Sequence, residues 1–208
     1  MSSISTKILV AAAAVVMAFP AVTANAQRVV HRGVVRRNAQ GGVTAARGTA
    51  VRGPNGGTAV HGRAVSTDAA GDVKSVRGTA VSGPNGGKAA RGARNTWNSN
   101  GSFTHKSGSV VQGPNGGTAA RAGTTTVNAD GSATHQSGFK ASGANGSIQS
   151  TGSSQRGADG SASGSRTTTE TGKNGNTYTG TTTWEKGQGV QHTGTCTDAS
   201  GNTIPCKK

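Results

Sequence analysis

Residues 53–82 read GPNGGTAVHGRAVSTDAAGDVKSVRGTAVS, a unit with two different turns, GPNGG at 53–57 and AAGD at 69–72. Glycines recur every 15 residues through this unit and its neighbours, at Gly41, Gly56, Gly71, Gly86, Gly101, Gly116, Gly131 and Gly146. The preceding residue is usually Asn or Asp. Asn-Gly and Asp-Gly are strong hairpin signals because both residues tolerate positive φ. The spacing therefore predicts an array of strands and turns.

The apolar residues repeat every 30 residues instead. One column holds Val43, Val73, Phe103 and Ala133, and another holds Val51, Val81, Val111 and Ala141. Two antiparallel strands and two different turns together make one repeating unit, which explains a period of 30 residues. We therefore predict an all-β, repetitive antiparallel strand–turn ribbon of 30-residue two-strand units, with strands of about 11 residues. The middle of each strand face is polar, which argues against a sandwich or barrel core.

Two alternatives to this ribbon stay open. A second glycine series falls in mid-strand, for example at Gly78 and Gly108. Such glycines can mark corners, which would make each 15-residue unit one coil of a β-solenoid. The chain is also expected to be partly disordered, because Gly, Ser, Thr and Asn dominate it and supply little apolar area to offset the entropy of ordering.

The first 26 residues have the layout of a secretory signal peptide. Lys7 precedes an apolar run over 8–19, and Ala24-Asn25-Ala26 is a small-residue cleavage site. The run is shorter than the roughly 20 residues that a membrane-spanning helix needs. We therefore expect cleavage between Ala26 and Gln27, no integral membrane span in the mature chain, and export to the periplasm, cell surface or extracellular space.

The mature chain divides into four predicted segments. A basic N-terminal arm covers 27–40 and the strand–turn repeats cover 41–152. A Gly/Ser/Thr-rich low-complexity segment follows at 153–176, and a C-terminal cap covers 177–208. Cys196 and Cys206 flank a turn at 200–202. In an exported chain this layout predicts a disulfide that staples a terminal hairpin.

The formal charge is +15, and residues 27–121 carry a net +12 of it. Such a balance favours polyanions as partners: anionic polysaccharide, lipopolysaccharide or extracellular DNA, bound without sequence preference. An equally valid interpretation is that the charge only keeps a repetitive, edge-rich chain soluble. The candidate polyanion-binding residues are Arg28, Arg32, Arg36, Arg37, Arg47, Arg52, Arg63, Arg77, Arg91, Arg94 and Arg121. Among them Arg91 and Arg121 share a repeat position with His61, and Arg47 shares one with Arg77.

Catalytic and metal chemistry find little support in the sequence. The five histidines are scattered, and Asp68 and Asp72 form the only near pair of acids and flank a turn. His105 and His135 share one column but have no carboxylate partners, so we predict no metal, no cofactor and no enzyme activity. The threonine triplets at 124–126, 167–169 and 181–183 are similar to ice-binding faces. Their irregular spacing predicts no continuous threonine ladder, and strand propensity explains them.

The GPNGGTA-x-R repeat of 113–121 and the ending TGTCTDASGNTIPC of 193–206 resemble short, repeat-rich exported proteins of Gram-negative bacteria that have no assigned activity. This resemblance covers most of the mature chain and implies no functional residues. Curli-type amyloid subunits share the plan of strand–turn repeats after a signal peptide, but their inward Gln/Asn ladders are not matched.

The sequence favours an exported, non-enzymatic repeat protein with a structural or adhesive role at the cell surface or matrix. Its basic N-terminal half is expected to bind anionic polymers. A self-assembling, amyloid-like β-fibre subunit is the first alternative, because repeated strands with exposed edges favour self-association. An ice-binding protein is the second.

Overall fold

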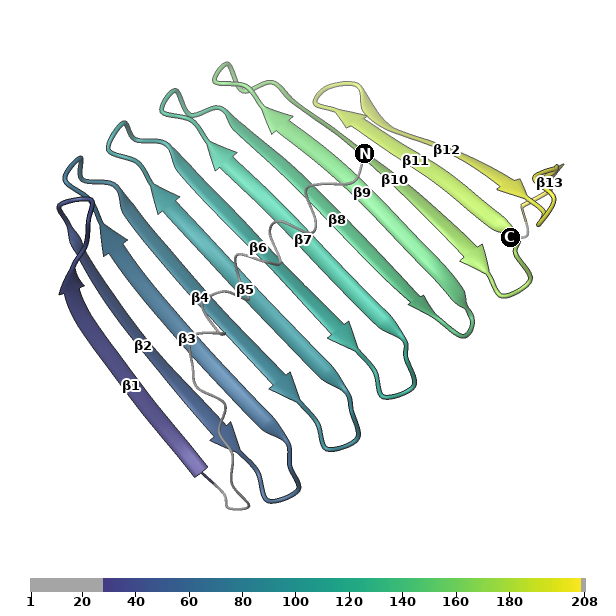
Figure 1. The fold of residues 1–208 in the computed structure, drawn as a ribbon. Coiled ribbons are helices and arrows are strands. Elements are labelled where there is room, and N and C mark those ends of the chain that lie inside the picture. The colour runs from purple at the N-terminus through teal and green to yellow at the C-terminus, as the bar shows by residue number, and fades with distance from the viewer. Residues whose placement is uncertain (1–27, 207–208) are drawn as a thin grey trace.

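The computed structural model describes residues 28–206, which form one open antiparallel sheet of 13 strands (Figure 1). The predicted signal peptide and its cleavage site at Ala26 and Gln27 lie outside the described residues. The strands are β1 (Arg28–Arg37), β2 (Val43–Arg52), β3 (Thr58–Thr67), β4 (Val73–Ser82), β5 (Lys88–Trp97), β6 (Phe103–Gln112), β7 (Thr118–Val127), β8 (Ala133–Gly143), β9 (Gly146–Arg156), β10 (Ala162–Gly172), β11 (Thr177–Glu185), β12 (Gly189–Thr197) and β13 (Thr203–Ile204). Within this range no helix is long and apolar enough to cross a membrane.

The predicted strand–turn ribbon is confirmed. Each strand pairs antiparallel with its sequence neighbours, in the order β1 to β13 without a crossover. The described residues thus form a meander and not the coils of the alternative solenoid. Strands β1–β7 have 10 residues each, one fewer than expected.

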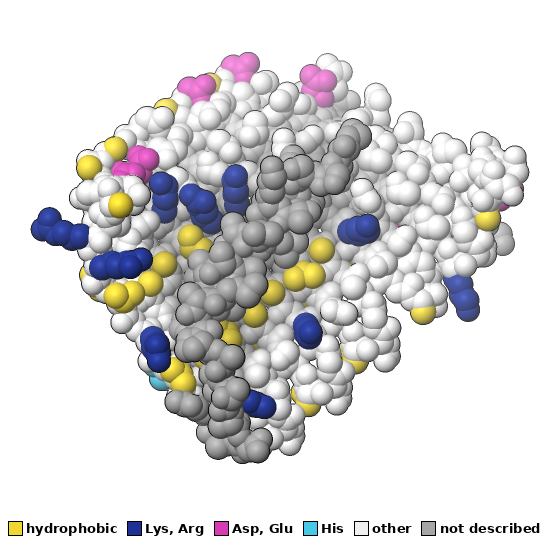
Figure 2. All heavy atoms as spheres, viewed as in Figure 1, with side chains coloured by type: hydrophobic (Ala, Val, Ile, Leu, Met, Phe, Trp, Pro, Cys, Tyr) yellow, Lys and Arg dark blue, Asp and Glu magenta, His cyan; other side chains and the backbone are white. Residues whose placement is uncertain are grey.

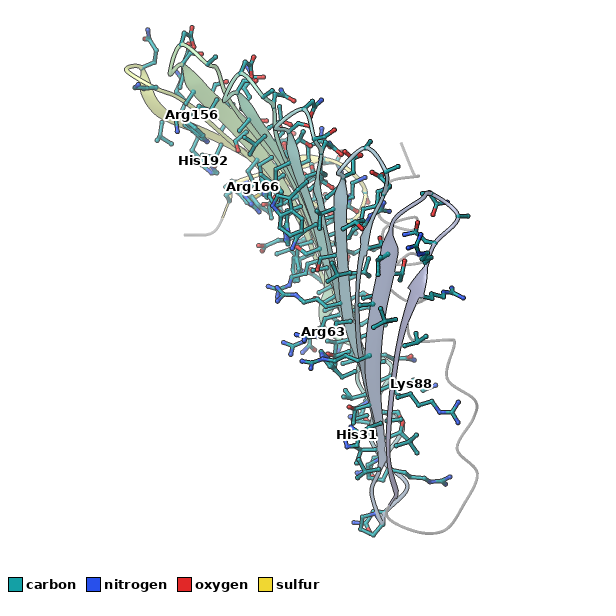
Figure 3. The ribbon with its side chains drawn as sticks, turned by 90° about the vertical axis from the view of Figure 1, so that its left-hand side faces the viewer. His31, Arg63, Lys88, Arg156, Arg166 and His192 are labelled. Atoms are coloured by element: carbon teal, nitrogen blue, oxygen red, sulfur yellow. A yellow bond between two sulfur atoms is a disulfide. The ribbon has the colours of Figure 1, made fainter. Side chains whose placement is uncertain are left out.

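The register aligns the 30-residue repeat across the sheet. Ala59 lies opposite both Val51 and Val81, so residues 30 apart occupy the same row of directly opposed residues. Because side chains alternate along a strand, each row belongs to one face. We call the face that carries Arg63 face A and the face that carries Lys88 face B. In the edge-on view of Figure 3, His31, Arg63, Arg166 and His192 lie on one side of the sheet and Lys88 on the other.

Residues 28–206 form no second layer over either face of the sheet. The two predicted apolar columns form rows along the two edges of face A, and Trp97 packs on Phe103 there with ring centroids 5.3 Å apart. Face B has an apolar row that the sequence analysis missed: Val30, Ala50, Val60, Ala80, Ala90, Val110 and Ala120. Among the described residues Ala50, 8% exposed, is the only buried apolar side chain. Interstrand hydrogen bonds therefore carry the fold in place of a core.

The turns explain the regular register. In the first, the amide of Gly41 donates to the carbonyl of Asn38 at 3.3 Å, and the amide of Asn38 donates to the carbonyl of Gly42 at 2.9 Å. Gly41 has φ +77°. This is a three-residue loop that ends in a left-handed glycine, the type I turn with a G1 bulge. All eight predicted turn glycines have positive φ.

The residue before each glycine does not adopt the positive φ that Asn and Asp tolerate. No non-glycine residue between 28 and 206 has positive φ. In the three-residue loops the reason is loop length: a turn with two left-handed residues closes a two-residue loop, whereas here the left-handed glycine follows a right-handed turn. The first central residue of this turn is Pro in the three GPNGG copies, where proline fixes the φ that a type I turn requires.

The β8–β9 turn breaks the pattern. Gly143 lies opposite Gly146, so Ala144 and Asn145 form a shorter loop. Here the sequence is GANGS, without the proline of GPNGG. The shorter loop shifts the later rows relative to the 30-residue period, but the sheet continues. The predicted low-complexity segment 153–176 contains the end of β9 and all of β10, and the predicted basic arm 27–40 contains β1.

The C-terminal strands are stapled as predicted. Cys196 and Cys206 form a disulfide with Cα atoms 5.3 Å apart. The turn between β12 and β13 spans 198–202, and the backbone partner of Cys196 is Ile204. The bridge therefore ties β12 to the residue two positions beyond β13 and holds this short strand at the sheet edge.

We predict that Gly86→Ala destabilises the β4–β5 hairpin by about 1–2 kcal/mol, the cost of a left-handed non-glycine residue. The added Cβ meets no atom within 4 Å, so crowding contributes nothing. Gly143→Ala is the matched control, because its Cβ also has open space and its φ is not positive. Urea unfolding and amide exchange at β4 and β5 measure the difference. Equal destabilisation by both variants would contradict this account of the turn.

We also predict that Cys196→Ser combined with Cys206→Ser frees β13 and leaves the rest of the sheet intact. Closing so short a loop contributes at most about 3 kcal/mol in the chain-entropy model. Because β13 pairs only with β12, hydrogen exchange should rise at β13 and the adjoining end of β12. Loss of protection in β1–β10 would show instead that the bridge supports the whole sheet.

Candidate functional site

Six arginines form a band across face A. Arg47, Arg63 and Arg77 lie directly opposite one another on β2, β3 and β4. The same row reaches Arg166 on β10. The adjacent row on this face holds His61, Arg91 and Arg121. We call Arg47, Arg63, Arg77, Arg91, Arg121 and Arg166 the arginine band.

The band is not neutralised by carboxylates. Like charges directly opposite each other destabilise a pair of strands, and neighbouring strands lie only about 4.8 Å apart. Arg47, Arg63 and Arg77 nevertheless have no side-chain hydrogen bond or ion pair with another described residue. Arg121 donates to the Ser109 hydroxyl at 3.1 Å and Arg166 donates to the Ser150 hydroxyl at 3.1 Å. Both of these acceptors are uncharged, so the band keeps its full positive charge.

The band lines a shallow groove of about 820 Å³. Arg77, Arg91, Arg121 and Arg166 border it together with Phe139. Its floor is made of glycine, alanine and serine from β4–β8, so the backbone is within reach of a ligand that lies between the guanidinium groups. A second hollow of about 410 Å³ lies towards β1, at the other end of the band.

The five histidines of the chain all lie on face A. The Nδ1 of each shares a hydrogen bond with a side chain directly opposite on a neighbouring strand. The pairs are His31–Thr49 at 2.9 Å, His61–Thr79 at 3.0 Å, His105–Asn95 at 2.6 Å, His135–Thr125 at 2.8 Å and His192–Thr182 at 2.8 Å. No group of three metal-ligating side chains occurs among the described residues. The histidines therefore add polar groups to the face of the arginine band.

The structure divides the predicted polyanion-binding residues between the two faces. Arg47, Arg63, Arg77, Arg91 and Arg121 lie together on face A, and Arg37 lies on the same face at the edge row with Val43. The register places Arg32, Arg36, Arg52 and Arg94 on face B, and Arg28 lies opposite Arg52. The sequence analysis missed Arg166, because it lies beyond the register change at β8–β9.

Four of the seven acidic residues lie at one rim of the sheet, away from the band, whereas Glu170 lies on face A of β10, four residues after Arg166. Asp68, Asp72, Asp130 and Asp159 lie in or beside the turns at one end of the strands, and Figure 2, which views face B, shows acidic side chains along that rim. The Ser132 hydroxyl donates to Asp130 at 2.7 Å and the Ser132 amide donates at 2.9 Å. These two bonds, the hydroxyl first, hold the pKa of Asp130 below its ordinary value. Ser161 lowers the pKa of Asp159 in the same way.

No protein-family model, curated protein or solved structure matches this chain. The geometry and charge of face A are therefore the basis on which the function of this chain is inferred.

We predict that Ser132→Ala raises the pKa of Asp130 towards its ordinary value and leaves that of Asp159 unchanged. A carboxylate with a lowered pKa stabilises the fold above its unfolded-state pKa, near 3.9, and this contribution is lost as the pH falls through the folded-state value. A carboxyl NMR titration of both residues in one sample tests this, with Asp159 as the internal control. An unchanged Asp130 titration would show that the Ser132 hydroxyl is not the cause.

Proposed function

We propose that this chain is an exported, non-enzymatic structural or adhesive protein of the cell surface or matrix, and that its arginine band binds linear anionic polymers. The candidates are anionic polysaccharide, lipopolysaccharide and extracellular DNA. One observation carries the proposal: arginines from four consecutive strands, β2 to β5, line up on one open face without acidic partners. Guanidinium groups bind carboxylate, sulfate and phosphate oxygens in bidentate fashion.

The shape of the band favours an extended ligand over a small anion. From Arg47 on β2 to Arg166 on β10 the band crosses eight strand spacings, or about 40 Å. Arginines that lie along a line match charges that lie along a line, whereas a small anion site needs donors that converge on one point. Binding of a polymer also relieves the repulsion between Arg47, Arg63 and Arg77, which the sheet holds side by side.

The recognition should be insensitive to sequence. Binding of single-stranded nucleic acid by stacking needs several aromatic side chains along the groove, and Phe139 is the only aromatic residue that lines it. The arginine band therefore attracts a nucleic acid by charge and does not distinguish one base from another. Binding that depends on phosphate or sulfate contacts weakens steeply as salt rises, because bound counterions are released.

The disulfide is consistent with an oxidising, exported environment. The self-assembling fibre finds less support. The open edge strand β1 carries Arg28, Arg32, Arg36 and Arg37, and charged residues on an edge strand oppose pairing with another chain.

The test compares two triple variants that remove the same charge. Arg63→Gln, Arg77→Gln and Arg91→Gln empty the centre of the band, whereas Arg36→Gln, Lys74→Gln and Arg94→Gln remove three charges from face B. We expect the face A variant to elute from heparin and DNA columns at much lower salt than the face B variant. For duplex DNA, the slope of log K against log salt should fall by about 0.9 for each phosphate that the variant no longer neutralises.

Two results would overturn the proposal. Equal weakening in both variants would show that net charge alone attracts the polymer. Retention of the unaltered protein in molar salt would show that the binding is not electrostatic. Circular dichroism of each variant confirms that the sheet is intact, as expected for exposed side chains.

A further inference from the structure

The other face of the C-terminal strands carries a regular array of threonines. β10, β11 and β12 place three threonines each on face B, at alternate positions, and the register aligns them. The rows are Thr167–Thr181–Thr193, Thr169–Thr179–Thr195 and Thr171–Thr177–Thr197. We call these nine residues the threonine array.

This array corrects the expectation that no continuous threonine ladder exists. The triplets at 167–169 and 181–183 drew attention to consecutive threonines, but consecutive residues point to opposite faces. The middle residue of the first triplet, Thr168, and the middle residue of the second, Thr182, lie on face A. The sequence signal that indicates the array is a threonine at every second residue of a strand. Antiparallel pairing then brings the alternate threonines of three strands into register.

The face B strand positions that adjoin the array are uncharged, and the nearest turn, between β10 and β11, contains Lys173. The face B positions next to it are Ser153, Ser165, Thr183 and Gln191 in one row, with Ser147 and Thr151 on β9. Glu185, at the far end of β11, is the only charged residue among the face B strand positions of β9–β12. A patch without charge on a chain of net charge +15 is unsuited to the polymer proposed for face A.

Face A supports the array from behind with bulky groups. The Tyr178 ring covers Gly180 and Gly194, and Trp184 covers Gly164, where an added Cβ would clash with each ring. The Cys196–Cys206 disulfide also belongs to this end of the sheet. Aromatic cover of cross-strand glycines stabilises the pairing of their strands. The aromatic rings of these strands thus pack on face A, and face B carries small, uniform side chains.

The threonine side chains are held in fixed positions. β-Branched residues have restricted χ1 angles, and three hydroxyl pairs link β10 to β11: Thr167–Thr181 at 3.1 Å, Thr169–Thr179 at 3.4 Å and Thr171–Thr177 at 3.2 Å. Each hydroxyl has one donor and two acceptor sites, so every paired hydroxyl can still bond water. The hydroxyls repeat about every 4.8 Å across the strands and about every 6.8 Å along them.

We propose that the threonine array binds the surface of ice. On flat faces of hexagonal ice the oxygen atoms repeat in two directions, at distances close to the two spacings of the threonine hydroxyls. A rigid array can therefore hold water molecules in positions that continue the crystal. Each contact is weak, and many of them add up only if the spacing matches in both directions. A hollow of about 330 Å³ borders the array at Thr167, but the other eight threonines lie outside it, so the occupant of the array is an extended surface. The absence of charge fits a neutral ligand.

Adjacent threonines of one strand provide the test. Thr181→Tyr raises a large side chain in the centre of the array, whereas Thr182→Tyr adds the same group to face A, one residue away on β11. Tyrosine is a good strand former, so both variants should fold. We expect the purified protein to inhibit ice recrystallisation and to partition into growing ice. Thr181→Tyr should lower this activity about tenfold by breaking surface complementarity, and Thr182→Tyr should leave it unchanged.

The outcomes separate this proposal from the polymer-binding one. Heparin retention should be the same in Thr181→Tyr and the unaltered protein, and the face A arginine variant should keep its ice activity. Absence of ice activity in the unaltered protein would overturn the inference, and so would equal activity of Thr181→Tyr and Thr182→Tyr. Matching circular dichroism and disulfide content in all samples ensures that a loss reflects the surface and not the fold.

Discussion

The hydrogen-bonded ladder between neighbouring strands is the interaction on which the rest of this structure depends. A sheet with both faces open has almost no core, and Ala50 is the only apolar side chain of the described residues that is buried. The strands must therefore keep an unbroken register, since residues 28–206 contain no second layer to compensate for a break in pairing. The glycine turns provide this by closing hairpin after hairpin with the same offset, which requires a left-handed residue at one fixed position, as at Gly41 and Gly86. Local turn chemistry thus sets the long-range order of the sheet.

Constant register turns sequence periodicity into surface pattern. Between β1 and β8 any residue type that recurs every 30 residues becomes a straight row across the sheet, as Val51 and Val81 do. Residues that lie opposite each other on successive strands are separated along the chain by two alternating numbers of residues. Arg47, Arg63 and Arg77 therefore form one row although their sequence spacings differ. Antiparallel pairing always produces such alternating intervals, because neighbouring strands run in opposite directions. It explains how an irregular scatter of arginines along the chain becomes a line of charge on one face.

The sequence was sufficient to predict the fold because two signals, the glycine spacing and the apolar period, agree on a meander. It was insufficient for the turn conformation, since Asn-Gly occurs in both two-residue and longer loops and only the number of intervening residues separates them. Arg47, Arg77, Arg91 and Arg121 were correctly aligned by repeat position. The face of Arg94 could not be assigned without the exact strand limits, because a shift of one residue moves a side chain to the other face. Arg166 and the threonine array lie beyond the β8–β9 turn, where the shorter loop ends the 30-residue alignment.

A single-layer sheet also separates the demands of stability from those of binding. In a protein with a core, one face of every strand is committed to packing, and only the other is free to vary. Both faces of the described sheet are free wherever the ladder alone holds the strands, so face A can carry uncompensated arginines in its centre while its two edge rows are mainly apolar between β2 and β8. At the C-terminal end the aromatic rings of Tyr178 and Trp184 cover glycines on face A, which leaves face B uniform. The two faces thus carry different chemistry, guanidinium groups on face A and hydroxyl groups on face B, and β10 contributes to both with Arg166 on one face and Thr167 on the other.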